Sequence, residues 1–306
     1  MSGILDTIGN TPLVRLRAPA GGDAAEVWIK LEGGNPTGSM KDRMARSMVE
    51  CALARGDLRA GGTVVEFTGG STGSSLALVC AAKGPRAHLV CSDAFAREKL
   101  DTMRALGAEL DVVPSDGGLI TPPLFDRMRA RVQKLAARPG AFWTDQFDNP
   151  DNRAGYHAMG EELLAQTGGR IDAFVMGVGT GGCFSGNAEV LKERLSSVTC
   201  VAVEPTASRA LSGGPLGGHR IEGIGAGFVG AITRTDLIDE VVAVGDDDAA
   251  AAARRLARQE GIFVGTSAGA NVTAALDLAR RLGPGRRVVT VAPDSGLKYL
   301  QGDLFA

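Results

Sequence analysis

A lysine stands at the start of an expected helix, in the segment GGNPTGSMKDRMARS at residues 33–47. Ser39 is the expected N-cap, because apolar residues follow it at helical spacing, and Lys41 then falls in the first turn. That turn faces the positive end of the helix dipole, which disfavours an ammonium group. A neutral amine is therefore favoured at Lys41, and this is the form that makes an imine with an aldehyde.

Two glycine clusters are candidate anion sites, because each lies between a buried strand pattern and a helix pattern. The first reads TGGSTG at residues 68–73, and the second reads GVGTGG at residues 177–182. Backbone N–H groups converge at such a helix N-terminus, and small residues let an anion approach the chain. Either cluster taken alone is also compatible with a tight turn that serves packing only.

The second cluster allows two interpretations. Gly177, Gly179 and Gly182 fit the GxGxxG dinucleotide fingerprint, and Glu204 closes the next expected strand, which would indicate an NAD-dependent oxidoreductase. That fingerprint usually opens the first βαβ unit of its domain, whereas several expected strands precede it here. A cofactor that carries one phosphate group and lies near a lysine would account for Lys41 and for one glycine cluster. The other cluster would then bind the carboxylate of a substrate. Pyridoxal phosphate meets this description.

Apolar, β-branched runs alternate with helical patterns, which predicts an α/β fold with mainly parallel strands covered on both faces. The Gly-rich segment 211–228 carries isoleucines and a phenylalanine and is expected to be an ordered loop. Lys30 lies in a strand pattern of alternating residues, and we expect its amine to lie in solvent. The expected strands are 63–67, 87–91, 109–113, 172–178, 198–204 and 286–293. The expected helices are 73–83, 96–106, 123–137, 153–167, 183–195, 247–260 and 269–282.

The composition argues against several classes of partner and site. The chain has 306 residues, 44% of them hydrophobic, which is enough for the core of two domains. A net charge of −2 gives neither a nucleic-acid footprint nor a polybasic membrane patch. Five cysteines without CxxC spacing argue against zinc and disulfides, and they predict reduced thiols in the cytoplasm. Neither a signal peptide nor an apolar run of about 18 residues is present, so secretion and membrane spanning are not expected.

Eight motifs occur in one order along nearly the whole chain. They are IGNTPLVRL (8–16), NPTGSMKDR (35–43), TGGSTG (68–73), RALGAEL (104–110), QFDNPDN (146–152), GVGTGG (177–182), HRIEGIGAGF (219–228) and GTSAGA (265–270). Together they resemble the cysteine synthase (O-acetylserine sulfhydrylase) family of fold-type II pyridoxal phosphate enzymes. The resemblance implies a tryptophan synthase β-like fold of two α/β domains, each a mainly parallel sheet flanked by helices, with the active site in the cleft between them.

The domains are expected at residues 1–148, with the substrate loop, and 149–306, with the cofactor phosphate loop. Whether roughly the first 35 residues pack on the second domain is left open. By the resemblance, Lys41 forms the imine with the cofactor and later removes the α-proton of the substrate, while no metal ion takes part. The cofactor would also be bound by Ser71, Gly179, Thr180, Gly181, Gly182, Cys183 and Ser267, the last at the pyridine nitrogen. The substrate would be bound by Thr68, Gly69, Ser71, Thr72, Gln146 and Gly225.

The implied reaction is β-replacement on an O-activated L-serine, for which O-acetylserine is the leading candidate. The reaction would pass through an α-aminoacrylate. Sulfide or a related sulfur nucleophile would give L-cysteine or an S-substituted cysteine. A β-eliminating lyase or dehydratase, and β-replacement with O-phosphoserine or a nucleophile such as thiosulfate, stay open. So do the NAD-dependent oxidoreductase and a catalytically retired member of the family. The family implies a cytoplasmic homodimer, and serine acetyltransferase is a conceivable partner.

Two loops depart from the pattern that is usual in this family. The substrate loop usually reads TSGNTG, whereas Gly69 here replaces the serine and Ser71 replaces the asparagine. Cys183 stands where a phosphate-binding threonine is usual, so a weak thiol donor replaces a hydroxyl. These changes leave the native acceptor and nucleophile open.

Overall fold

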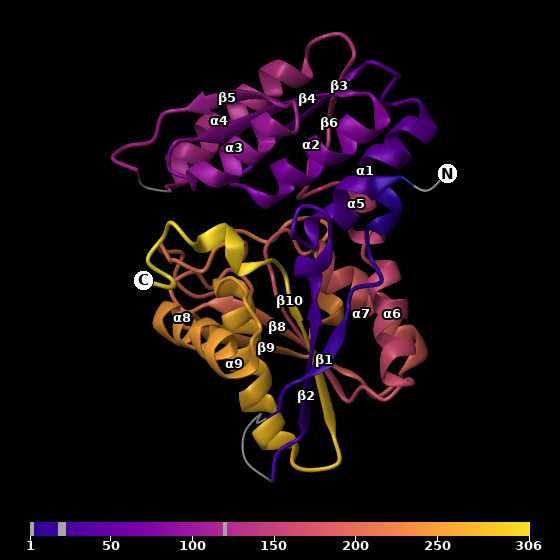
Figure 1. The fold of residues 1–306 in the computed structure, drawn as a ribbon, viewed down its shortest axis with the longest axis vertical. Helices are drawn as coiled ribbons and strands as arrows, with labels where there is room; N and C mark the ends of the chain where they lie inside the picture. The colour runs from indigo at the N-terminus through magenta and orange to yellow at the C-terminus, as the bar shows by residue number, and fades with distance from the viewer. Residues whose placement is uncertain (1–2, 18–22, 119–120) are drawn as a thin grey trace. The chain divides into compact units, whose positions relative to one another are not determined.

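The computed structural model describes residues 3–17, 23–118 and 121–306, and the chain divides into two compact units (Figure 1). Unit 1 comprises Met1–Ile8 and Asn35–Gly155, and unit 2 comprises Gly9–Gly34 and Tyr156–Ala306. Residues 149–155 thus group with unit 1, and residues 9–34 group with unit 2. Each unit contains its own sheet with flanking helices, which confirms the expected α/β architecture with two mainly parallel sheets.

Unit 1 is built on a four-stranded parallel sheet in the order β5-β4-β3-β6. Helix α4 covers one part of this sheet, where Leu124, Met128 and Val132 pack with Val65 and Phe67 of β3. The strands are β3 (Thr63–Phe67), β4 (Arg86–Ser92), β5 (Glu109–Val113) and β6 (Ala141–Trp143). The helices are α1 (Lys41–Arg55), α2 (Ser71–Lys83), α3 (Arg97–Ala105), α4 (Pro122–Ala136), α5 (Pro150–Ala154) and a short 3-10 turn at Ile4–Thr7.

Unit 2 is built on a six-stranded sheet in the order β1-β2-β10-β7-β8-β9. Strand β1 runs antiparallel to β2, and the other described pairs are parallel. Helices α8 and α9 lie on one face, and α6 and α7 lie on the other (Figure 1). The strands are β1 (Leu13–Arg15), β2 (Glu26–Leu31), β7 (Ala173–Gly177), β8 (Thr199–Pro205), β9 (Glu240–Val244) and β10 (Arg287–Ala292). The helices are α6 (His157–Thr167), α7 (Gly182–Arg194), α8 (Asp246–Arg255) and α9 (Thr266–Leu282), with short helical turns at Glu32–Gly34, Thr235–Leu237, Leu256–Glu260 and Gly296–Tyr299.

The expected strands and helices are all present, with ends that differ by a few residues. The helix expected at 153–167 is divided into α5 and α6 by Gly155, which packs closely against α1: a Cβ there would lie 2.9 Å from the carbonyl oxygen of Arg43. The segment 211–228 is an ordered loop, as expected. Met40, which directly precedes α1, already has helical dihedral angles (φ −57°, ψ −19°), and the Ser39 hydroxyl accepts the backbone N–H of Lys41. Ser39 therefore caps the start of the helix, as expected.

The expectation that Lys30 reaches solvent is wrong, since its side chain is fully buried. Strand β2 lies between β1 and β10, so it is an interior strand of the sheet. The Lys30 amine pairs with the Glu162 carboxylate at 2.6 Å and donates to the carbonyl oxygen of Thr11 at 2.7 Å and to Gln166 Oε1 at 2.8 Å. These three acceptors replace the hydrogen bonds to water that the ammonium group loses when it is buried.

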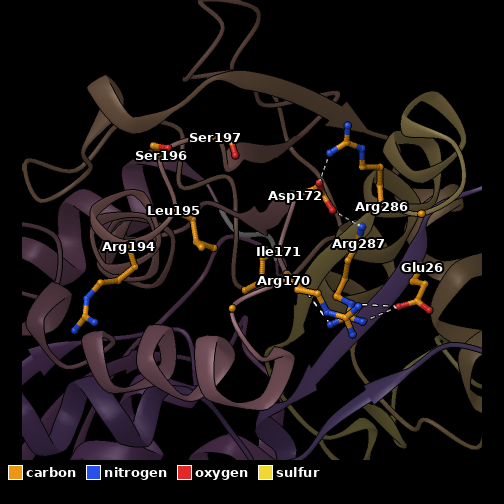
Figure 2. A pocket seen from close by; sticks show the side chains of 12 residues that line it. Glu26, Arg170, Ile171, Asp172, Arg194, Leu195, Ser196, Ser197, Arg286 and Arg287 are labelled. Carbon is orange, nitrogen blue, oxygen red and sulfur yellow. Dashed lines mark hydrogen bonds and ion pairs between the residues drawn. The ribbon is translucent and has the colours of Figure 1, made fainter.

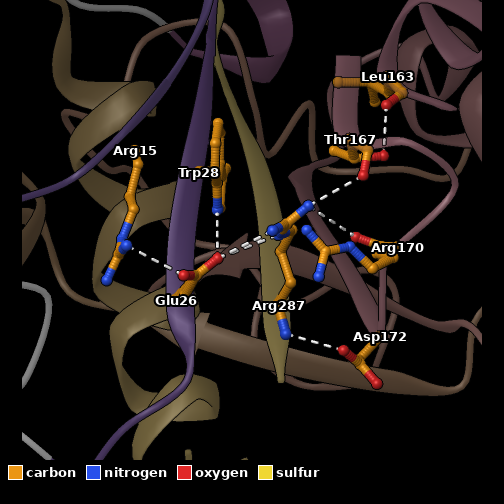
Figure 3. Close-up of polar contacts among 8 residues, drawn as sticks. All are labelled: Arg15, Glu26, Trp28, Leu163, Thr167, Arg170, Asp172 and Arg287. Atoms are coloured by element: carbon orange, nitrogen blue, oxygen red, sulfur yellow. Dashed lines mark hydrogen bonds and ion pairs between the residues drawn. The ribbon is translucent and has the colours of Figure 1, made fainter. Parts of the chain in front are cut away.

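A second polar cluster holds the amino ends of the central strands of unit 2 together (Figure 3). The Arg287 guanidinium pairs with Glu26 at 3.1 Å, donates to the carbonyl oxygen of Thr167 at 3.0 Å and lies 4.7 Å from the Trp28 ring centroid. The backbone N–H of Arg287 donates to the Asp172 carboxylate at 2.8 Å. One arginine therefore links β2, β10, the end of α6 and the residue before β7.

We expect Lys30→Met to lower the free energy of unfolding by about 3–5 kcal/mol, because Glu162 would keep its charge in a mostly buried position without a cation. Urea denaturation of the full chain measures this loss. Lys192→Met is the control, since Lys192 pairs with Asp239 where both side chains are partly exposed, and it should cost less than about 1 kcal/mol. Equal losses in the two variants would contradict the role assigned to Lys30.

Candidate active site

Lys41 is the first residue of α1, so it occupies the first helical turn as expected. Its backbone N–H donates to the Ser39 hydroxyl at 3.2 Å. The next residue, Asp42, is fully buried, and its carboxylate accepts the backbone N–H of Thr37 at 2.8 Å and the hydroxyls of Thr37 and Ser75, each at 2.6 Å. Asp42 therefore ties the start of α1 to the preceding loop and to α2, which fixes the backbone that carries Lys41.

The predicted substrate loop connects the carboxyl end of β3 to the start of α2. Its first residue, Thr68, donates its N–H to the carbonyl oxygen of Val90 on β4 at 2.9 Å. The hydroxyl of Thr72 donates to Gln146 Oε1 at 2.8 Å, and the Gln146 amide donates to the carbonyl oxygen of Phe67 at 3.1 Å. The structure thus brings Gln146 against this loop, as the assignment of both to one site requires.

A buried carboxylate under this loop was not anticipated from the sequence. Glu66 is the fourth residue of β3, and each of its oxygens accepts two hydrogen bonds. Oε1 accepts from the backbone N–H of Phe67 at 2.9 Å and from the Trp143 indole at 3.1 Å, while Oε2 accepts from the Thr144 hydroxyl at 2.7 Å and the backbone N–H of Gln146 at 3.0 Å. Glu66 therefore positions the backbone of Gln146. The available signal was a carboxylate in the otherwise apolar strand TVVEF, directly before the loop.

The protonation of Glu66 is a balance between burial and hydrogen bonding. Burial raises the pKa of Glu66 to about 7 from an ordinary value of 4.5, and the four donors oppose this change in part. A neutral carboxyl group would place its own proton against the hydrogen of one of these donors. An arrangement of four donors therefore suits the ionised form.

Both glycines at the start of the substrate loop are covered by the segment 95–99. A Cβ at Gly69 would lie 2.7 Å from Phe95 Cε1, and a Cβ at Gly70 would lie 2.4 Å from Lys99 Cδ. Gly70 also has a φ of +153°, which L side chains rarely adopt. The aromatic ring of Phe95 thus occupies the space of a side chain at position 69, which accounts for a glycine where the resembled family has a serine.

The predicted phosphate loop leaves the carboxyl end of β7 and opens α7. Its glycines are required by close contacts: a Cβ at Gly179 would lie 2.3 Å from the carbonyl oxygen of Gly223, and a Cβ at Gly181 would lie 2.0 Å from Thr233 Oγ1. Gly181 also has a φ of +88°. The first N–H groups of α7 have no acceptor within the helix, so the loop is a cradle of small residues at the positive end of a helix.

Two residues near this loop are engaged in contacts of their own. Cys183 is buried, and its sulfur accepts the Asn187 amide at 3.6 Å. The Glu204 carboxylate accepts the backbone N–H of Leu211 at 2.8 Å and the hydroxyl of Ser212. Glu204 is thus committed to holding the following loop, which argues against the ribose-binding role of a dinucleotide enzyme.

The remaining predicted residues of unit 2 lie on its loops and on α9. Ser267 is the second residue of α9 and is buried. Gly225 has a φ of +67°, and its N–H donates to the carbonyl oxygen of Val178 at 3.0 Å, directly before the phosphate loop. The structure therefore groups Gly225 with the phosphate loop, while Arg220 on the same Gly-rich segment is paired with Asp246 and Asp247.

A cavity of about 650 Å³ in unit 2 is lined by none of the site residues predicted in that unit (Figure 2). It is found at the amino ends of the strands, whereas the phosphate loop follows the carboxyl end of β7. Its wall includes Arg286, paired with Asp172 at 2.8 Å, and Arg287, paired with Glu26. Both arginines are thus neutralised by carboxylates at the cavity wall, and this cavity is separate from the phosphate loop of unit 2 (Figure 2).

Comparisons with known proteins find relatives among the pyridoxal phosphate enzymes. A family model described as "Pyridoxal-phosphate dependent enzyme" matches residues 4–294. A cysteine synthase of Staphylococcus aureus (strain N315) is 42% identical over 308 residues, covering 99% of this chain and 96% of that protein. The structure of an O-ureido-L-serine synthase aligns with a TM-score of 0.93 at 38% identity, covering 100% of this chain and 95% of the other. A cysteine synthase of Entamoeba histolytica aligns with a TM-score of 0.92 at 34% identity, covering 100% and 90%.

Within residues 3–17, 23–118 and 121–306, no helix combines the length and apolar character needed to cross a membrane. The same residues contain no group of three or more His, Cys, Asp or Glu side chains that could hold a metal ion.

The raised pKa of Glu66 predicts a specific pH dependence of stability. Below pH 4.5 the carboxyl group is protonated in both the folded and the unfolded chain; above it the unfolded chain releases the proton first. The wild type should therefore lose about 3 kcal/mol relative to Glu66→Gln as the pH rises from 4.5 to 7. Urea denaturation of both proteins across this range measures the difference. A wild type that gains stability relative to Glu66→Gln as the pH rises would instead show that the four donors outweigh burial.

The contact between Gly69 and Phe95 predicts that Gly69→Ser lowers the free energy of unfolding by about 1–3 kcal/mol, because the added Cβ must displace the ring. Adding Phe95→Ala should make the serine less costly than it is in the wild type, and denaturation of the two single variants and the double variant measures this coupling. Gly218→Ser is the control, since a Cβ there would meet nothing within 4 Å. Additive effects of Gly69→Ser and Phe95→Ala would contradict the steric explanation.

Proposed function

The chain belongs to the pyridoxal-phosphate dependent enzyme family, and we propose that it is a cysteine synthase-type transferase acting on an O-activated L-serine. Its cofactor is pyridoxal 5'-phosphate. O-Acetylserine is the first substrate to consider, with sulfide or a related sulfur nucleophile giving L-cysteine or an S-substituted cysteine. The observation that carries the proposal is Lys41 at the first turn of α1, in a chain that also carries a glycine cradle at the start of α7.

The residues present fit such a cofactor. Donors at a helix N-terminus favour a phosphate group, and the close contacts of Gly179 and Gly181 exclude side chains at these two positions of the loop. We assign the phosphate to the loop formed by Gly179, Thr180, Gly181, Gly182 and Cys183, and the pyridine nitrogen to the buried hydroxyl of Ser267. Pyridoxal phosphate, when bound, supplies an electron sink that stabilises negative charge at the α-carbon of the substrate.

Residues of unit 1, together with Gly225 of unit 2, perform the remaining tasks in this proposal. The amine of Lys41 would hold the cofactor and would accept the α-proton of the substrate. Asp42 accepts hydrogen bonds from Thr37 and Ser75 and so fixes the start of α1, which carries Lys41. We assign the substrate α-carboxylate to the loop residues Thr68, Gly69, Ser71 and Thr72 together with Gln146, and the wall of the substrate site to Gly225. Glu66 acts indirectly, by holding the backbone of Gln146.

The proposal extends to how the enzyme works in the cell. The family resemblance supports a homodimer in the cytoplasm, and serine acetyltransferase is the protein partner to test. Light scattering of the purified protein, alone and mixed with serine acetyltransferase, measures both associations. A monomer that does not bind the acetyltransferase would contradict both proposed associations, but it would not contradict the proposed reaction.

The visible absorption spectrum of the purified protein tests the reaction. We expect a visible band from lysine-bound cofactor, a change of that band with O-acetylserine, and its return with sulfide. Lys41→Ala should abolish the lysine-bound band and reduce turnover by about 10³-fold or more, because the attachment point and the base are one group. Lys83→Ala is the matched control, since Lys83 lies in the same unit and pairs with Glu50 at 2.6 Å.

The other outcomes separate the alternatives. Pyruvate release without sulfide would favour a β-eliminating lyase or dehydratase. A band that does not change with O-acetylserine would indicate that the substrate is O-phosphoserine or another activated serine. A response only to thiosulfate would indicate that thiosulfate is the nucleophile. Absence of any band in protein supplied with the cofactor would overturn the proposed function.

A further inference from the structure

A buried hydroxyl beside the phosphate loop has no partner within the described part of the chain. Thr233 is 9% exposed, and its Oγ1 is buried without a hydrogen bond. Buried hydroxyls are nearly always hydrogen-bonded, because leaving one unpaired forfeits its interaction with water. Such an atom in a native structure indicates that a group from outside the chain pairs with it.

The position of this hydroxyl is set by its neighbours on the loop. Oγ1 of Thr233 lies 2.0 Å from where a Cβ of Gly181 would be, so it lies against the backbone of the phosphate loop. The backbone N–H of Thr233 donates to the carbonyl oxygen of Gly230 at 3.0 Å, and the next N–H, of Arg234, donates to the Ser185 hydroxyl on α7 at 2.9 Å. The segment that carries Thr233 is thus fastened to the first turn of α7, and the hydroxyl is held against the loop.

The loop itself is short of one hydroxyl donor. Cys183 has a thiol, which is a weak donor, and its sulfur receives the Asn187 amide at 3.6 Å. A phosphate dianion has oxygens that accept strong charge-assisted hydrogen bonds, and a hydroxyl is a much better partner for them than a thiol. Thr233 reaches the same loop from a segment 50 residues further along the chain.

We propose that Thr233 binds the cofactor phosphate, donating its hydroxyl at the loop 179–183 in place of the hydroxyl that Cys183 lacks. This inference rests on the proposed function, which assigns the phosphate to that loop. It adds to the phosphate site a residue that lies outside the glycine motif, and it explains how a thiol is tolerated at position 183.

The test is a titration of the apoprotein with pyridoxal phosphate and, separately, with pyridoxal, followed by absorbance and fluorescence. Thr233→Val should weaken pyridoxal phosphate binding roughly 10-fold, because one hydrogen bond to a charged group is lost. It should leave pyridoxal binding unchanged, since pyridoxal carries no phosphate. Thr233→Ser keeps the hydroxyl and should bind pyridoxal phosphate nearly as the wild type does, and Thr235→Val is the control at an exposed threonine of the same segment.

Two further readouts separate this role from a structural one. The melting temperature of the apoprotein should not fall in Thr233→Val, since the variant removes a buried polar atom that has no partner. In a Cys183→Thr background the same valine substitution should weaken pyridoxal phosphate binding much less, because the threonine supplies the hydroxyl.

The failure of the inference is distinguishable from failure of the proposed function. A wild type that binds no pyridoxal phosphate would overturn the proposed function. A wild type that binds it as tightly as Thr233→Val does would overturn only the inference. Equal weakening of pyridoxal phosphate and pyridoxal, or a lower melting temperature of the apoprotein, would also overturn it, since either result indicates a packing role.

Discussion

The candidate site depends on one constraint that operates in both units: a buried parallel strand must pass into a helix within a few residues. In unit 1 the passage from β3 to α2 is made by residues 68–70, and in unit 2 the passage from β7 to α7 is made by residues 178–181. Neighbouring atoms leave no room for a Cβ at Gly69 and Gly70 of the first turn or at Gly179 and Gly181 of the second. Close packing thus selects glycines at the same turns where a helix start can bind an anion, so the packing requirement and the binding capacity have the same origin.

The polar residues of the structure divide by the end of the sheet at which they lie. At the amino ends of the unit 2 strands, Arg287 and Glu26 satisfy one another and the surrounding carbonyl groups. At the carboxyl ends, Asp42 and Glu66 accept hydrogen bonds from the loops that carry the assigned site residues. Carboxylates suit this second task because each oxygen accepts two donors, so one side chain can fix several backbone segments.

Much of the fold was predictable because it depends on local pattern. Continuous apolar runs and helical periodicity placed the central strands and most helices, and glycine clusters marked the turns where ligands are expected. The three-residue strands β1 and β6 were not predicted, because so short a segment carries no periodicity. Lys30 was misjudged since alternation along a strand does not show whether a neighbouring strand covers its polar face. Glu66, Phe95 and Thr233 act through contacts between segments distant in sequence, which a pattern along one segment cannot reveal.

The pairing of β2 has a consequence for the order in which the chain can fold as it is made. Strand β2, at residues 26–31, pairs with β10 at residues 287–292, and β10 also pairs with β7. The contacts that complete unit 2 therefore form only after residues 287–292 have been made, whereas all residues of unit 1 have been made by Gly155. Non-local pairing of this kind is slow and leaves strand edges exposed while it waits. The nascent chain must thus carry strand β2, already made and still unpaired on one side, until β10 has been made.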